Sequence, residues 1–399
     1  MVKIVKKNPI AIIFATYIVI EVCKVTGWVC GPPMQRFFHL TNTQLGLILS
    51  ALSLGALLMC MRIGRISDQM GLWRIWKVGI IGSIASILLI FFSQGFWTVF
   101  IPLFLLGVMH VLTLNANNTY LGGAFRDNNL RVMAFASGLW FASSAISTPL
   151  LGLWVEYADR NGLGRMMFLG PYAVEALGLF AVLFWGGRLA KPIMKKADFD
   201  EKNNIELKDD QKIHEKKNVF GCFAVLFMGY CHGSMLVGII SWVNPMVQQR
   251  FQVTDFYGSL TFTGFALGLA IGRFALAGGL SNLSIRMLLG LSTIIGGVIL
   301  SFAMFAPTFW ITVAAIAIGG IGVSVTAPCL LALIPEQFHA IRAHMYGYLG
   351  ASMCIASFIT PSIIGVLADH GLGINISLLT STFSAIMLGL MSLIWKLKG

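Results

Sequence analysis

One stretch of this chain occurs twice: Trp28-Val29-Cys30-Gly31-Pro32-Pro33-Met34-Gln35-Arg36-Phe37 shares its first two and last three residues with a segment 214 positions later, which begins at Trp242-Val243 and ends at Gln249-Arg250-Phe251. A second pair, Thr148-Pro149-Leu150-Leu151-Gly152 and Thr360-Pro361-Ser362-Ile363-Ile364-Gly365, is 212 positions apart. All four segments lie in strongly apolar surroundings. The repeats therefore predict two parallel halves, which in a membrane can rock against each other around a site at their interface.

The composition of the chain predicts that its solvent is lipid. Its 399 residues are 57% hydrophobic and only 11% charged, which is too little charge to cover a soluble surface. A spanning helix needs about 20 apolar residues. We count twelve such runs, which predict an all-α membrane protein of twelve transmembrane helices in two pseudo-symmetric six-helix bundles: 8–31, 44–63, 75–95, 97–121, 131–155, 166–188, 219–245, 257–278, 284–304, 308–334, 342–367 and 374–395.

The positive charge is divided unequally between the two sides of these spans. Of the 28 Lys and Arg residues, 23 fall at the termini or in the even-to-odd loops, four fall on the other side and Lys24 lies within a span. The positive-inside rule then places both termini in the cytoplasm of a cell that carries the protein in its inner, or cytoplasmic, membrane. A net charge of +12 distributed in this way does not indicate nucleic acid as a partner.

The one long hydrophilic stretch divides the chain at its middle. It predicts a six-helix bundle over 1–190, a cytoplasmic linker over 191–218 and a second six-helix bundle over 219–399. The chain offers no soluble domain for separate chemistry. Its seven cysteines all lie in apolar segments without metal-type spacing, so we expect buried thiols, no metal site and no cofactor.

A family resemblance rests on the segment Gly64-Arg65-Ile66-Ser67-Asp68-Gln69-Met70-Gly71-Leu72-Trp73-Arg74. It resembles the loop signature of the major facilitator superfamily, with Gln69 and Leu72-Trp73 in place of basic residues. The second half keeps only Ile271-Gly272-Arg273 of this loop. The resemblance implies a bonded loop that latches the cytoplasmic side, for which the candidates are Gly64, Asp68, Gly71 and Arg74, with Arg131 as the partner of Asp68.

A narrower resemblance concerns the segment from Phe38 to Ile48, which looks like the one before span two in fucose-permease-type sugar–proton symporters. Those symporters couple protons through carboxylates on spans one and four. Here the first of these positions falls on Trp28, and span four has no acid, so the coupling residues do not carry over. The superfamily resemblance implies alternating access, and this one implies a sugar-like solute.

Charged residues inside spans are expensive and indicate function. Glu21, Lys24 and Trp28 share one face of the first span. Either Glu21 and Lys24 neutralise each other or Lys24 snorkels, or this face lines a cavity in which Lys24 contacts the solute and Glu21 titrates. Glu175 in span six is a further candidate for proton coupling, although span six tends to lie outside the central cavity of this fold.

Other polar residues gather on four spans. Span four carries His110 with Asn117 and Asn118, and spans five and seven add Trp140, Ser144, His232 and Trp242. A water-filled cavity can supply the hydrogen-bond partners that such side chains need. Aromatic faces, amides and hydroxyls suit a neutral polar solute, whereas Lys24 and two histidines equally suit a carboxylate or a phosphate ester. Packing roles remain an alternative for each of them.

The sequence thus predicts a secondary active transporter that couples protons to a small polar organic solute, with a sugar as the first choice. An organic-anion transporter using Lys24 and a drug or metabolite exporter are alternatives, and a non-transporting receptor is a further one. An enzyme is disfavoured because no nucleophile–base, zinc-protease or phosphate-loop motif occurs. We expect the lipid bilayer, the solute and protons as partners of a monomer. Glu21 and His110 are the first candidates for titrating groups.

Overall fold

The computed structural model describes residues 8–60, 62–125, 129–195, 219–279, 284–338 and 342–395. These residues form helices without any strand, and twelve of the helices are long and apolar enough to cross a membrane. In the first half the helices are α1 (Asn8–Val29), α2 (Gly31–Phe38), α3 (Asn42–Cys60), α4 (Ile63–Met70), α5 (Leu72–Ile90), α6 (Phe96–Ala124), α7 (Asn129–Arg160) and α8 (Met166–Ala181), which continues through a π-helical turn to Lys195.

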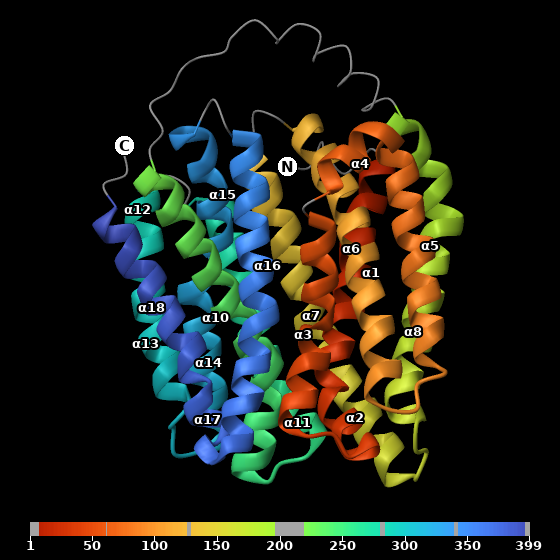
Figure 1. Cartoon of the computed structure of the whole chain (residues 1–399), viewed down its shortest axis with the longest axis vertical. Helices are drawn as coiled ribbons and strands as arrows, with labels where there is room; N and C mark the ends of the chain where they lie inside the picture. Colours follow the sequence, from red (N-terminus) through yellow and green to blue (C-terminus); the bar gives the residue numbers. More distant parts are fainter. Residues whose placement is uncertain are drawn as a thin grey trace, which may run out of the picture.

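The second half repeats this arrangement. Its helices are α10 (Val219–Phe251), α11 (Asp255–Gly278), α12 (Ile285–Met287), α13 (Thr293–Ala303), α14 (Phe309–Val323), α15 (Thr326–Gln337), α16 (Arg342–Leu367), α17 (Ile374–Ser377) and α18 (Leu379–Ile394). The two halves form two bundles side by side (Figure 1). We name the two ends by their short helices: α2 and α17 mark the α2/α17 end, and α4 and α12 mark the opposite α4/α12 end.

Three apolar clusters make up the core. One lies within the first half and one within the second, while the third joins Val25, Leu49 and Phe141 of the first half to Trp242 and Phe265 of the second. Across this interface α3 packs against α16 and α7 packs against α11. Burial of apolar side chains from both halves therefore stabilises the contact between them.

Small residues let the backbones of the paired helices approach. A Cβ atom added to Gly46 of α3 would lie 2.5 Å from the carbonyl oxygen of Pro361 in α16, which is closer than real Cβ contacts. In lipid, such close backbone packing replaces the hydrophobic driving force between helices. Pro149 and Pro361, the prolines of the second repeat, occupy the interiors of α7 and α16, so the repeat has the same place in both halves.

The tryptophans of the first repeat face the protein interior. Trp242 is 0% exposed, and the half-buried ring of Trp28 lies 6.1 Å from the ring of Phe262 in α11. Several predicted boundaries differ; for example, α7 ends at Arg160 rather than 155 and α10 at Phe251 rather than 245. The first span ends at Val29, because Pro32 and Pro33 favour the first turn of a new helix, α2. The segment expected as the loop between spans two and three is mostly helical, as α4.

Candidate functional site

The site begins at the face of α1 that carries Glu21 and Lys24. Glu21 is buried, and its Oε1 accepts a hydrogen bond of 2.9 Å from Ser144 Oγ of α7. Lys24 Nζ lies 4.1 Å from the ring centroid of Trp140, one helical turn before Ser144. This cation–π contact suits a partly desolvated ammonium. One face of α7 thus holds both charged groups of α1.

Arg273 is the site residue that sequence reasoning misplaced. Sequence reasoning assigned it to the remnant of the cytoplasmic loop, although the predicted span 257–278 contains it. It lies within α11, five residues before the helix ends, and is 5% exposed. Its Cζ lies 4.5 Å from the ring centroid of Phe141, and its Nε donates to the carbonyl oxygen of Ser324 at 3.3 Å. Its run of apolar neighbours in α11 was the signal that could have found it, because a charge in such a run is intramembrane.

The charges of this site act on one another across the interface. The carboxylate of Glu21 interacts with the positive charges of both Lys24 and Arg273. Within the described part of the chain, the ion pairs closer than 4.0 Å are Arg36–Asp255 and Arg160–Glu156. Lys24 and Arg273 therefore stand near one acid without a contact ion pair, each on an aromatic ring.

Three polar residues of α6 were predicted for the first-half side of the site. His110 is 1% exposed and close enough to Lys24 to interact with its charge, and neither ring nitrogen has a hydrogen-bond partner. Both amide atoms of the buried Asn117 also lack a partner. Asn118 is exposed and accepts a hydrogen bond from Tyr17 of α1, whose ring tilts toward Trp140. Buried polar groups without partners are rare in proteins and call for an explanation.

The residues predicted on span seven, now α10, are bonded within the second half. His232 Nδ1 lies 2.7 Å from Thr326 Oγ1, and the ring interacts with the charge of Arg273. Trp242 donates its Nε1–H to the carbonyl oxygen of Pro361 at 3.0 Å. His232 thus belongs to the surroundings of Arg273, whereas the indole N–H of Trp242 is already used in holding α10 against α16.

Glu175 lies on the other side of α1. Thr26 of α1 donates a hydrogen bond to its Oε1, and Cys23 is a neighbour, so Glu175 belongs to the packing of α8 against α1. Glu21 and Lys24 use the opposite face of the same helix. The structure therefore does not bring Glu175 together with the site around Arg273.

The predicted latch lies at the α4/α12 end. Gly71 separates α4 from α5 with φ of 76°, a conformation that favours glycine. Arg74 and Arg131 are both exposed. Gly64 and Asp68 belong to α4, but the side chain of Asp68 lies outside what the structure describes, so the expected pairing of Asp68 with Arg131 stays a prediction.

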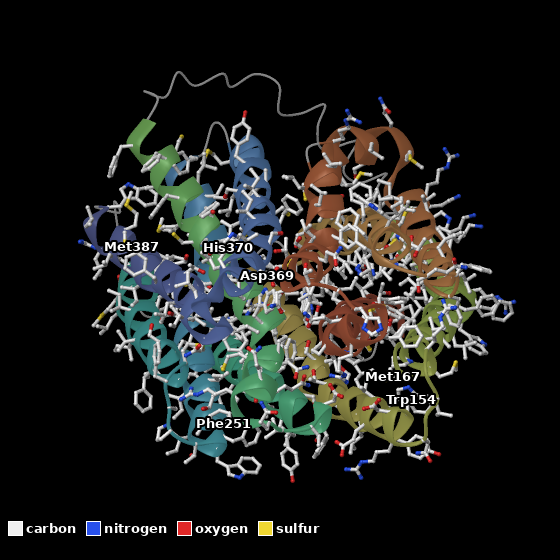
Figure 2. All side chains as sticks on the ribbon, turned by 60° about the horizontal axis from the view of Figure 1, so that its bottom comes forward. Trp154, Met167, Phe251, Asp369, His370 and Met387 are labelled. Atoms are coloured by element: carbon white, nitrogen blue, oxygen red, sulfur yellow. The ribbon has the colours of Figure 1, made fainter. Side chains whose placement is uncertain are left out.

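The α2/α17 end is closed by three polar contacts between the halves. Arg36 Nη2 lies 2.7 Å from Asp255 Oδ2, and Gln248 donates to the other oxygen of that carboxylate at 2.8 Å. Asp369 accepts three hydrogen bonds at the start of α3, from the backbone N–H of Asn42 and from the N–H and hydroxyl of Thr43. Figure 2 shows Asp369 at the boundary between the bundles.

The third contact is the counterpart of the second. Glu156 and Asp369 each stand four residues after the glycine that ends the second repeat. Glu156, at the end of α7, accepts a hydrogen bond of 2.8 Å from the hydroxyl of Thr254, which precedes α11. In both pairs, a carboxylate at the end of one helix meets the beginning of a helix of the opposite half, where negative charge is favourable.

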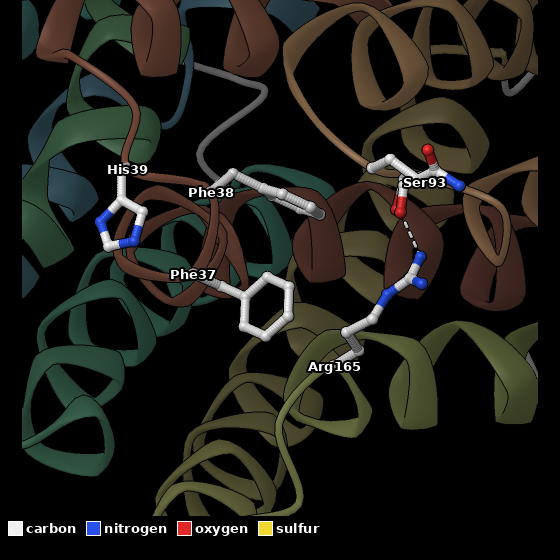
Figure 3. Close-up of a pocket in the computed structure, with 6 residues that line it drawn as sticks. Phe37, Phe38, His39, Ser93 and Arg165 are labelled. Atoms are coloured by element: carbon white, nitrogen blue, oxygen red, sulfur yellow. Dashed lines mark hydrogen bonds between the residues drawn. The ribbon is translucent and has the colours of Figure 1, made fainter.

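A pocket of about 390 Å³ lies apart from this site. It is lined by residues near the α2/α17 end of the first half alone, namely Phe37, Phe38, His39, Ser93, Gln94 and Arg165 (Figure 3). Arg165 uses its guanidinium to bond the carbonyl oxygens of Phe91 and Ser93. Because no residue of the second half lines it, this pocket does not join the two halves. Among the described residues, no three His, Cys, Asp or Glu side chains gather as a metal site requires.

Comparisons with known proteins agree with this architecture. The sequence model of the family described as Major Facilitator Superfamily matches residues 13–249 and again residues 220–398. The chain is also 24% identical over 401 residues to YybO, an uncharacterized transporter of Bacillus subtilis (strain 168). That alignment covers 92% of this chain and 88% of the Bacillus protein.

Proposed function

Because the chain belongs to the Major Facilitator Superfamily, we propose that this multi-pass membrane transporter carries a small polar organic solute by alternating access and is driven by protons. The superfamily consists of transporters rather than enzymes, and its members work in a lipid bilayer on small molecules. The proposal that protons drive transport rests on Glu21, a buried acid that interacts with cations of both halves.

Protonation of Glu21 would change the attraction between the halves. The ionised carboxylate attracts Arg273 of the second half, whereas the protonated group does not. Lys24 and Ser144 face the same carboxyl group from α1 and α7. A proton arriving at Glu21 therefore weakens one electrostatic attraction across the interface, which is what coupling of a proton to rocking requires. His110 is the second candidate, and Glu175 the third.

The solute site that we propose lies around this acid. Lys24, Trp28, Trp140, Ser144, Asn117 and Asn118 supply it from the first half, and His232 and Trp242 from the second. The unpartnered atoms of His110 and Asn117 and the N–H groups of Trp28 and Trp140, which also lack partners, support it. Amides, indoles and an imidazole bond solute hydroxyl groups, which is the support for a sugar-like solute.

We further propose that the α2/α17 end faces the outside of the cell and that the inner membrane holds the protein as a monomer. Arg36, Arg160, Arg165 and Arg250 lie toward this end, while most of the other cations that the structure describes lie toward the α4/α12 end. In this orientation both termini are cytoplasmic, and the latch formed by Gly64, Asp68, Gly71, Arg74 and Arg131 is cytoplasmic too. The bundles would comprise 1–190 and 219–399, joined by the linker 191–218.

Reconstitution tests the proposal. We expect purified protein in proteoliposomes to acidify the lumen, reported by a trapped pH dye, when a solute panel is added outside at a lower pH. Protein-free liposomes and liposomes with the Glu21→Gln variant serve as controls. Solute accumulation that follows a sodium gradient and ignores a proton gradient would contradict proton coupling, and binding without any flux would indicate a receptor.

A further inference from the structure

Resting on the transporter function proposed above, we propose that the solute is a small hydroxylated monocarboxylate, bound between Lys24 of the first half and Arg273 of the second. The chain around these residues contains one aromatic surface, one acid and two cations. Each of these features contributes a separate step to the argument.

The two cations are held on adjacent rings. Lys24 contacts the ring of Trp140 and Arg273 contacts the ring of Phe141, and the two rings are stacked with centroids 6.2 Å apart. Neither cation belongs to an ion pair within 4.0 Å in the described part of the chain. Aromatic faces hold a cation without neutralising it, so both charges remain available to an anion.

The local charge is unbalanced. Glu21 is one acid near two cations, so the local charge is +1 when Glu21 is ionised and +2 when it is protonated. An unbalanced charge within a membrane is costly, and an opposite charge that arrives with a ligand compensates it. A monocarboxylate brings one negative charge. A phosphate monoester brings nearly two at neutral pH and would reverse the imbalance whenever Glu21 is ionised.

Unpartnered polar atoms of α6 favour hydroxyl groups on the same solute. His110, which interacts with the charge of Lys24, has two ring nitrogens without partners, and Asn117 has a free amide oxygen and a free amide nitrogen. Both side chains are at least 99% buried. Hydroxyl groups both donate and accept, so they match these atoms. A neutral sugar would satisfy the same atoms but would leave the excess charge uncompensated.

The position of the cations also links the ligand to movement. Lys24 belongs to α1 and Arg273 to α11, so one carboxylate bound to both would draw the two halves together. A guanidinium and an ammonium bond a carboxylate through charge-assisted hydrogen bonds, which are about twice as strong as neutral ones. A neutral solute would lose the charge-assisted bonds to both Lys24 and Arg273.

The test compares carboxylates with neutral analogues of the same skeleton. Binding to the detergent-purified full chain is measured by thermal shift and calorimetry for lactate, glycerate, gluconate and glucuronate. Each is matched with its neutral analogue: propane-1,2-diol, glycerol, glucitol or glucose. We expect at least one carboxylate to bind at least about tenfold more tightly than its analogue, the difference that charge-assisted bonds supply. Glucose 6-phosphate is included to test the two-charge alternative.

Variants assign the effect to residues. Lys24→Gln and Arg273→Gln should each weaken carboxylate binding by about tenfold or more, and Lys24→Arg should retain most of it. Lys77→Gln, which removes an exposed cation of α5, is the matched control and should bind within about twofold of the unaltered chain. The melting temperature without solute reports whether each variant folds.

Three results would overturn the proposal: no carboxylate of the panel binds, a neutral analogue binds equally well, or the Lys24→Gln and Arg273→Gln variants both bind normally. Tighter binding of glucose 6-phosphate than of gluconate would also overturn it. These are binding measurements, so their failure is separate from failure of the proposed function. Charge-dependent binding without proton-linked flux would contradict only the latter.

Discussion

Arg36 and Asp255 connect the two halves through an ion pair, with Arg36 Nη2 2.7 Å from Asp255 Oδ2. Arg250, the counterpart of Arg36 in the second copy of the repeat, stays within its own half and bonds the carbonyl oxygens of Met304 and Ala306. In the first half, Arg165 bonds the carbonyl oxygens of Phe91 and Ser93 in the same way. The repeated arginine has thus taken a role in closure in one copy and a role in helix capping in the other.

Breaking this ion pair should favour opening at the α2/α17 end. Because Arg36 is 47% exposed, we expect Arg36→Gln to shift the equilibrium by only about 1 kcal/mol, or roughly fivefold. The readout is the rate at which an impermeant maleimide labels a cysteine introduced at Ser50, which lies against Ser362 of α16 in the closed contact. The Arg36→Asp, Asp255→Arg double variant should restore slow labelling. Equal labelling in all variants would show that the pair does not hold this end closed.

Asp369 should contribute more to closure than its counterpart Glu156. Asp369 accepts three hydrogen bonds at the beginning of α3, whereas Glu156 accepts one from Thr254. We expect Asp369→Ala to cost about 1–2 kcal/mol of the closed state and Glu156→Ala about 0.5 kcal/mol. The two variants are compared by the rate at which the maleimide labels a cysteine introduced at position 50. If Glu156→Ala accelerates labelling as much as Asp369→Ala does, the number of hydrogen bonds that each carboxylate accepts does not determine its contribution to closure.

Glu21→Gln should reduce the proton-driven accumulation of solute but leave the exchange of solute across the membrane. Glutamine keeps the shape and accepts the hydrogen bond of Ser144, but it cannot bind and release a proton. We expect proton-driven accumulation to fall by about tenfold or more, while exchange of labelled for unlabelled solute continues. Ser144→Ala removes only the hydrogen bond and should reduce accumulation a few-fold. Undiminished accumulation by Glu21→Gln would move the coupling role to His110 or Glu175.

Gly46→Ala should destabilise the interface between α3 and α16. The added Cβ would lie 2.5 Å from the carbonyl oxygen of Pro361, so the helices must separate, at a cost of about 1–3 kcal/mol. A lower melting temperature in detergent measures this. Gly347→Ala in α16 is the matched control, because its Cβ would have no neighbour within 4 Å and alanine favours helix. A melting temperature of Gly46→Ala equal to that of the control would mean that the two helices are not tightly packed there.

Much of the fold could be read from the chain. Runs of about 20 apolar residues report spanning helices because lipid leaves the backbone no other partner, and twelve such helices are present. The repeated Trp-Val and Thr-Pro segments indicated two equivalent halves, and Trp242 is buried as that arrangement requires. The spacing of Glu21 and Lys24 placed them on one helical face, and both contact residues of α7. These features are local, because they depend on composition and on the period of a helix.

The contacts between distant segments followed from packing alone. No period or motif connects Asp369 with Thr43, or Arg36 with Asp255, because such pairs are more than 200 residues apart and meet only where two bundles touch. Arg273 lies within the predicted span 257–278, but only the packing of α11 against α7 buries it beside Phe141. Hydropathy and repeats therefore specify which helices form and in what order. The orientation of each helix against its neighbours specifies which charges face one another, since that depends on side-chain shapes from both halves together.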